Sequence, residues 1–213
     1  MPPQPNVDGR RQRSARTRTR IVETAAGLFL AQGYLATTIE VVAEQAGVAV
    51  QTIYYVFGTK PNLLAAVLDV TIAGDAEPVP MLQRPWVEDL RAETNGTHAV
   101  QRLVDASTAI VARAAPIYDV VRQAAADAEV KVLLDGTKRR RRLDQRQLVE
   151  ILAQSGHLRS DIDLDAGADI VYALINEEVF QLLTRDCGWS VDRFQRWASS
   201  LLAHQLVGVT ASR

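Results

Sequence analysis

The chain has 213 residues, 47% of them hydrophobic, which is enough for a sizeable core in one or two domains and excludes an intrinsically disordered protein. No apolar run approaches the roughly 18 residues of a membrane span, so we expect no membrane partner. The net charge of -1 conceals an asymmetry: residues 1–60 hold seven basic and four acidic residues, whereas the remainder holds 17 and 21. Positive charge gathered in one part of a chain is typical of nucleic-acid binding.

The N-terminal segment contains three prolines and almost no apolar side chains, so we predict a disordered basic arm over residues 1–15. Its arginines either contact DNA or belong to a solvated tail, and the sequence leaves both readings open. A first helix is predicted over residues 16–32, where apolar side chains recur at the spacing of one helix face: Ile21, Ala25, Leu28 and Phe29. Gly33 is expected to end this helix.

Residues 38–60 have the pattern of two short helices separated by a tight turn. Thr37 is expected to cap the first helix, with Glu40 reaching back to the free amide at its start, as in a capping box. Gly47 lies where the chain must reverse, because glycine enters the left-handed conformation at little cost. The second helix is predicted over residues 50–56, with its polar side chains and two tyrosines pointing outward. Such a helix suits the major groove of DNA.

Several short motifs follow one another at a fixed spacing here: Thr37-Thr38, Val42-Ala43, Ala46-Gly47-Val48, Thr52-Ile53-Tyr54-Tyr55, Phe57-Gly58-Thr59-Lys60 and Leu63-Leu64. Over about residues 16–70 they resemble the DNA-binding domain of the TetR family of transcriptional regulators. Two positions depart from that family's pattern. Ala49 replaces a frequent capping serine, and Val56 replaces a frequent His or Asn near the phosphates.

Positions on the second helix suggest how DNA would be contacted. Val50, Gln51 and Thr52 are expected to face bases, and Val50 could meet a thymine methyl group. The expected phosphate contacts come from Thr37, Thr38, Tyr54, Tyr55 and Lys60, and the predicted DNA-binding set is completed by Arg16 and Arg18.

A change of composition marks the predicted domain boundary. Thr59 is expected to cap a fourth helix that starts near Lys60 and Pro61. Residues 74–96 then hold three prolines and two glycines. We therefore predict a helix-turn-helix DNA-binding domain over residues 16–73 and a helical effector-binding and dimerisation domain over residues 74–213.

The second domain has a helical pattern almost throughout, with helices predicted at 97–114, 116–125, 127–155, 165–186 and 190–207. Pro116 is expected to start a helix, because proline disrupts a helix interior. No alternating strand pattern is sustained. The prediction is an all-α protein.

The last two predicted helices have apolar faces wider than the core of one subunit needs. Pairing with the same helices of a second chain would form a four-helix bundle, the C2 arrangement that the resemblance implies, although packing within one chain is an alternative. The interface candidates are Leu174, Phe194, Trp197 and Leu201. A homodimer presents two recognition helices to double-stranded DNA, which predicts a roughly palindromic operator.

The resemblance also implies a small-molecule effector that binds the second domain and releases DNA. Tyr172, Asn176 and Phe180 are four residues apart and would share one face of a helix, where they either line a pocket or pack in the core or dimer interface. Further candidates are Trp86, Arg113 and Tyr118. We expect the effector to be largely apolar with a few polar groups.

The chain offers few groups for catalysis. His98, His157 and His204 are far apart and form no metal-binding pair, and no phosphate-binding loop or nucleophile motif occurs. The basic run at residues 138–142 is expected to be a charged helix face. The single cysteine, Cys187, fits a reducing compartment, so we expect a cytoplasmic protein. We expect no catalytic site, cofactor or metal.

These features predict a sequence-specific DNA-binding regulator, a homodimeric repressor released from its operator by a small ligand. The alternative is a ligand-binding or partner-binding helical protein in which DNA binding is secondary or absent.

Overall fold

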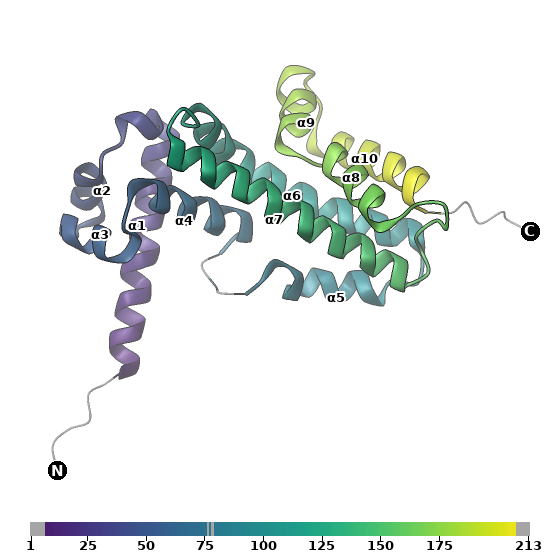
Figure 1. Ribbon diagram of the computed structural model, residues 1–213, viewed down its shortest axis with the longest axis horizontal. Helices are drawn as coiled ribbons and strands as arrows, with labels where there is room; N and C mark the ends of the chain where they lie inside the picture. Colours follow the sequence, from purple (N-terminus) through teal and green to yellow (C-terminus); the bar gives the residue numbers. More distant parts are fainter. Residues whose placement is uncertain (1–6, 76, 78, 208–213) are drawn as a thin grey trace, which may run out of the picture. The chain divides into compact units, whose positions relative to one another are not determined.

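The computed structural model describes residues 7–75, 77 and 79–207 and is built from helices (Figure 1). In chain order these are α1 (Val7–Ala36), α2 (Ile39–Ala46), α3 (Val50–Phe57), α4 (Lys60–Ala73), η1 (Met81–Gln83), α5 (Pro85–Ala92), α6 (Gly96–Gln123), α7 (Ala128–Gln154), α8 (Leu164–Leu174), α9 (Glu177–Gln181), the π-helical η2 (Leu182–Asp186) and α10 (Val191–Leu206). Within the described ranges the β pairing is one isolated bridge, between Leu158 and Val207. The predicted all-α fold is confirmed.

None of the helices in the described ranges is by itself long and apolar enough to cross a membrane. One pair of helices among the described residues, α3 and α4, reaches the length and composition of a span when taken together, but the pair is bent by 70° at its junction.

The chain divides into two compact units. The first extends to Thr71 and also takes in Pro116–Leu134, and the second comprises Ile72–Ala115 and the chain from Asp135 onward. Residues 116–134 were assigned from sequence to the second domain. Their contacts place them in the first unit, and Ile117, Tyr118 and Val121 are buried there.

Helix α1 begins at Val7, nine residues earlier than predicted. Residues 7–15 are therefore helical, and the predicted disordered arm is wrong over this stretch, whereas residues 1–6 lie outside the described residues. The prolines end at Pro5, and the Arg, Gln and Ala residues that follow favour helix. The backbone leaves the helical conformation at Gly33, as predicted, although α1 is assigned to Ala36. Gly33 has φ 82 and ψ 167, a conformation accessible to glycine.

Helices α2 and α3 form the predicted helix-turn-helix, and α2 packs against both α1 and α3 (Figure 1). Gly47 ends α2 in the left-handed conformation, with φ 63 and ψ 44, and its N–H donates to the carbonyls of Ala43 and Glu44. Helix α3 is held by two inward side chains, Ile53 and Phe57, which are 1% and 7% exposed. The polar side chains and the two tyrosines of α3 are left pointing outward, as predicted.

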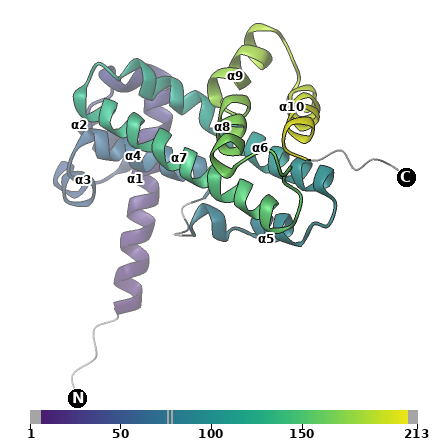
Figure 2. The same ribbon diagram turned by 45° about the vertical axis from the view of Figure 1, so that its right-hand side comes forward.

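Two predictions for the later helices are wrong. Helix α6 continues through Pro116, where a break was predicted. An interior proline costs about 3 kcal/mol, and the buried Ala114, Ala115 and Ile117 around it offset that cost. The single helix predicted over residues 165–186 is broken after α8, because Asn176 leaves the helical conformation and caps α9. Figure 2 shows the helix axis turning between α8 and α9.

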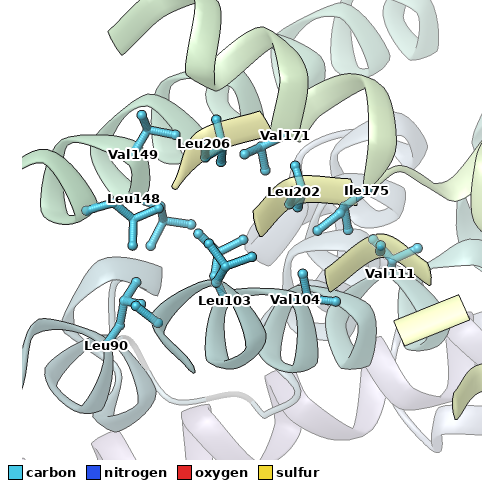
Figure 3. Packing of buried hydrophobic residues seen from close by; sticks show 14 of the residues in the cluster. Leu90, Leu103, Val104, Val111, Leu148, Val149, Val171, Ile175, Leu202 and Leu206 are labelled. Carbon is cyan, nitrogen blue, oxygen red and sulfur yellow. The ribbon is translucent and has the colours of Figure 1, made fainter. Parts of the chain in front are cut away.

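One apolar cluster forms the core of the second unit (Figure 3). It joins Leu103 and Val104 of α6 with Leu148 and Val149 of α7 and with side chains of α5, α8 and α10. The fully buried members from α8 and α10 are Val171, Phe194, Ala198, Leu202 and Leu206. A continuous core of this kind holds α6, α7, α8 and α10 together as one bundle.

Candidate nucleic-acid interface

The outward face of α3 exposes polar and aromatic side chains. Tyr55 is 91% exposed and Tyr54 49% exposed, although an aromatic ring loses favourable burial when it faces water. Gln51 is also exposed, and Val50 and Thr52 are partly exposed. The structure therefore brings these five predicted DNA-binding residues onto one short helix with an unburied face.

The first turn of α3 is open to a ligand. Its N-cap is Ala49, and no side chain accepts a hydrogen bond from the first amides of the helix. The amides at a helix start lack helical partners, and the helix dipole adds partial positive charge there. In this position an anion such as a phosphate oxygen would be stabilised. The departure from the family's capping serine thus leaves the N-terminus of α3 uncapped.

The two threonines before α2 have different roles from those predicted. Thr38 is the N-cap, and its hydroxyl accepts a hydrogen bond from the Val41 amide at 3.3 Å. Thr37 is 0% exposed, and its hydroxyl donates to the Gly33 carbonyl at 2.8 Å. The predicted cap at Thr37 and its predicted phosphate contact are therefore wrong, because this side chain is used inside the fold to close the turn. With the cap at Thr38, Glu40 is no longer at the capping-box position.

Lys60 packs against an aromatic ring at the start of α4. Its ammonium lies 4.1 Å from the centroid of the Tyr34 ring. Burial lowers the pKa of Lys60, and the negative charge of Asp127 opposes this shift. Burial also raises the pKa of Tyr34 to about 12, with smaller contributions from Asp127 and Glu129. Lys60 is thus a partly exposed cation whose position is set by Tyr34.

Arg16 and Arg18 are both exposed on α1. The Arg18 guanidinium lies 4.7 Å from the centroid of the Phe57 ring, which is the last residue of α3. A cation over an aromatic face is attracted by the ring quadrupole. The structure therefore holds one predicted DNA-binding arginine next to the recognition helix, as the charge distribution of the sequence indicates.

The six predicted effector residues are divided between the two units. Tyr118 is 3% exposed and belongs to the first unit, whereas the other five belong to the second. Trp86 packs against the apolar core. Arg113 is exposed and donates to the Ile72 carbonyl at 2.7 Å.

The shared helix face predicted for Tyr172, Asn176 and Phe180 is wrong, because the helix breaks between them. The Asn176 amide is used locally: it accepts from the Val179 amide at 2.8 Å and donates to the carbonyls of Tyr172 and Ala173. Phe180 is 7% exposed and meets Phe194 edge to face, with ring centroids 5.2 Å apart. These side chains serve as a helix cap and as core packing.

The four candidates for the dimer interface differ in their exposure. Phe194 is 0% exposed within one chain, so its predicted place on a dimer surface is wrong and it belongs to the core. Leu174, Trp197 and Leu201 retain partly exposed surface. Between them on the chain, Leu182 is exposed as well.

Sequence reasoning missed several polar contacts. It did not predict that Tyr34 would hold Lys60, or that Arg141 in the basic run would pair with the buried Glu177 of α9. Two acidic residues lie in the first turn of α9, and only burial in the fold distinguishes Glu177 from Glu178. Within the described ranges, no three His, Cys, Asp or Glu side chains gather so that they could hold a metal ion.

Comparison with solved structures shows the same fold in three other proteins. FadR from Bacillus subtilis, in complex with stearoyl-CoA, has 18% identity and a TM-score of 0.65 over 87% of this chain and 97% of that chain. NalD, the secondary repressor of the MexAB-OprM multidrug efflux pump in Pseudomonas aeruginosa, has 19% identity and a TM-score of 0.64 over 93% of this chain and 99% of that chain. SmeT in its triclosan complex has 17% identity and a TM-score of 0.68, covering 92% and 94%.

Comparison by sequence assigns the N-terminal unit. No curated protein matches the chain. Residues 21–67, which contain the second half of α1, all of α2 and α3 and the first half of α4, match the family model described as bacterial regulatory proteins, tetR family. The matched domain, residues 21–67, belongs to the tetR family of bacterial regulatory proteins, and the whole chain has the fold of the three proteins above.

Proposed function

We propose that the protein is a homodimeric repressor that binds a palindromic operator and leaves it when a small, largely apolar ligand occupies the second unit. The observation that carries DNA binding is the exposed face of α3, where Tyr55 is 91% exposed beside Gln51 at the uncapped start of the helix. The protein would act in the cytoplasm, where its operator lies, and without catalysis.

The side chains of the interface divide by the chemistry that they offer. Gln51 can make a bidentate contact with the base edge of adenine, and Val50 and Thr52 offer methyl groups to thymine. Thr38, Tyr54, Tyr55 and Lys60 would contact phosphates, with Arg16 and Arg18 adding positive charge along α1. Phosphate contacts set affinity and salt dependence, whereas base contacts set sequence preference.

Dimerisation is supported by an apolar surface that one chain leaves open. Leu182 is 52% exposed and Val191 42% exposed, close in sequence to the partly exposed Leu174, Trp197 and Leu201. Exposed apolar residues that gather at one end of a chain favour association. A C2 pairing through this surface would use the same residues from both chains and would match the symmetry of a palindromic site.

Repression and ligand release are supported by the related folds. NalD is described as a repressor, and FadR and SmeT are described as complexes with stearoyl-CoA and triclosan. The protein has a form that binds the operator and a form that does not. A ligand releases DNA only if its affinity for the second form is higher than its affinity for the first. A coupling of about 1–3 kcal/mol, typical of allosteric proteins, would change operator affinity about 5-fold to 150-fold.

A repression assay tests this proposal. The operator, obtained by selection from random duplexes, is placed across a promoter that drives a reporter, and the protein is produced in the same bacterium. We expect reporter output to fall, and sedimentation of the purified complex to show two chains per operator. Increased output, or one chain per operator, would contradict the proposal.

A further inference from the structure

The N-terminal half of α1, residues 7–20, lies outside the core of the first unit, and we call it the arm helix. The first buried side chain of α1 is Ile21, and none of the earlier side chains that the structure describes is buried. Figures 1 and 2 both show the arm helix continuing past α2 and α3. At a rise of 1.5 Å per residue it is about 21 Å long. A helix this short that packs against nothing is only marginally stable in water.

The arm helix is strongly basic, and its exposed charge is not balanced within the fold. Residues 7–20 contain six arginines and one acidic residue. Arg13, Arg16 and Arg20 are exposed and share one helix face, because they are three and four residues apart. Within the described part of the chain, no ion pair or hydrogen bond involves these three side chains. Like charges at this spacing repel one another, so the arm helix on its own is destabilised by its charge.

Several arginines of the second unit differ in this respect. Their ion pairs join Arg84 to Asp75, Arg102 to Glu93 and Arg142 to Asp169, with distances of 2.6, 2.9 and 2.7 Å. The positive charge of these side chains is balanced inside the protein, whereas the charge of the arm helix is left for a partner outside it. Phosphate is an anion that the planar guanidinium group binds well, through two parallel hydrogen bonds.

The arm helix is continuous with the proposed DNA interface. Its residue Arg18 places a guanidinium 4.7 Å from the centroid of the Phe57 ring, and Phe57 is the last residue of α3. Helix α3 has eight residues and is therefore about 12 Å long, shorter than the arm helix. Phosphates of one DNA strand are about 3.4 Å apart, so a helix of about 21 Å spans about six of them. The arm helix thus extends the basic surface beyond the reach of α3.

We propose that the arm helix is a second DNA-contacting element, which binds operator phosphates beyond the stretch of groove that α3 reads. The inference rests on the proposed function, because α3 must first place the protein on the operator. These contacts are to the DNA backbone, so they add affinity and salt dependence without adding sequence preference. Phosphates also neutralise Arg13, Arg16 and Arg20 and remove their mutual repulsion, so DNA stabilises the arm helix.

Neutral linkages in the DNA backbone test the contact. Methylphosphonates replace the charged phosphates of the selected operator one at a time, and binding of the full-length protein to each duplex is measured. The wild type should lose affinity at several positions. We expect Arg13→Gln to become insensitive at one of them, different from the position lost with Lys60→Ala, and to keep the base preference. Gln has a helix propensity similar to that of Arg, so the arm helix itself is retained.

Two matched variants complete this experiment. Arg13→Lys keeps the charge and should keep the sensitivity of the wild type at every position. Arg139→Gln removes an exposed arginine from α7 in the second unit and should leave the whole pattern unchanged. The same insensitive position in Arg139→Gln as in Arg13→Gln would show a general effect of net charge and overturn the inference.

Salt dependence gives the size of the effect. Loss of one phosphate contact lowers the salt slope by about 0.9, so between about 50 and about 200 mM salt the affinity of Arg13→Gln should fall about threefold less than that of the wild type. A wild-type salt slope together with an unchanged methylphosphonate pattern would overturn the inference. A palindromic operator that is still selected and bound in that case would retain the proposed function, whereas failure to select any operator would overturn both.

Discussion

Gln51 and Lys60 should affect DNA binding in different ways when each is replaced by alanine. Gln51 is exposed on α3, whereas Lys60 offers a partly exposed charge held by Tyr34. We expect Gln51→Ala to relax sequence preference at one base pair, with a loss of about 1–3 kcal/mol on the preferred site. Lys60→Ala should weaken binding to all sequences and lower the salt slope by about one unit. Binding to a set of single-base operator variants at several salt concentrations separates the two effects, and equal losses on every duplex for both variants would contradict this division.

Tyr34 should make stability depend on alkaline pH. Its pKa is raised to about 12, mainly by burial, whereas an unfolded tyrosine titrates near 10. The folded state therefore holds this proton more tightly, and the stabilisation is fully present below about pH 10 and is lost as the pH rises toward about 12. Tyr34→Phe keeps the ring beneath Lys60 and removes the proton. We expect the free energy of unfolding of the wild type to fall more steeply over this range than that of the variant, measured with denaturant at each pH, and parallel curves would refute the assignment.

At the scale of elements, the helix-turn-helix depends on the conformation of one glycine. Gly47 has φ 63, and a Cβ there would meet no atom within 4 Å, so the effect of a substitution comes from the backbone alone. We expect Gly47→Ala to lower the free energy of unfolding by about 1–2 kcal/mol. The control is Gly27→Ala within α1, which also has open space for a Cβ and should stabilise by about 0.5–1 kcal/mol. Thermal and denaturant unfolding measure both, and a stabilising Gly47→Ala would contradict the structure of the turn.

The helices of the DNA-binding domain could be predicted from local features of the sequence. The spacing of apolar residues predicts the buried face of α1, and Gly47 marks the turn between α2 and α3, because these features depend on neighbours within one or two helical turns. The exposed residues of α3 follow from the same pattern. The shift of the cap from Thr37 to Thr38 escaped prediction, because two adjacent threonines satisfy the same local rule and only packing against Gly33 distinguishes them.

The helices from α6 onward were less predictable because their bounds are decided by tertiary packing. The pattern of apolar residues continues from α8 into α9, yet Asn176 caps a new helix between them. Pro116 lies inside α6, where its local preference is overridden. The exposure of single side chains could not be predicted either. Phe194 and Leu201 lie two helical turns apart on α10 and so share one face, but only Phe194 is fully buried.

At the scale of the whole molecule, dimerisation should depend on the apolar surface near the C-terminal end of the described chain. We expect Leu201→Glu to convert a dimer into a monomer and to weaken operator binding, because a charge placed at a paired apolar surface would be buried without a partner. Leu143→Glu is the matched control, since Leu143 is 59% exposed on α7 and lies outside the proposed interface. Light scattering after size exclusion gives the mass of each variant. Two dimeric variants, or a monomeric wild type, would contradict the proposed pairing.

Operator recognition by α3 is tested by selecting random duplex DNA with the purified protein and then measuring binding to the selected site over a range of salt concentrations. A specific regulator should yield a palindromic sequence, bind it with a Kd of about 10⁻⁸ M or tighter, and lose affinity steeply as salt rises. Weak binding that is equal for all sequences would contradict the assignment of α3 as a recognition helix.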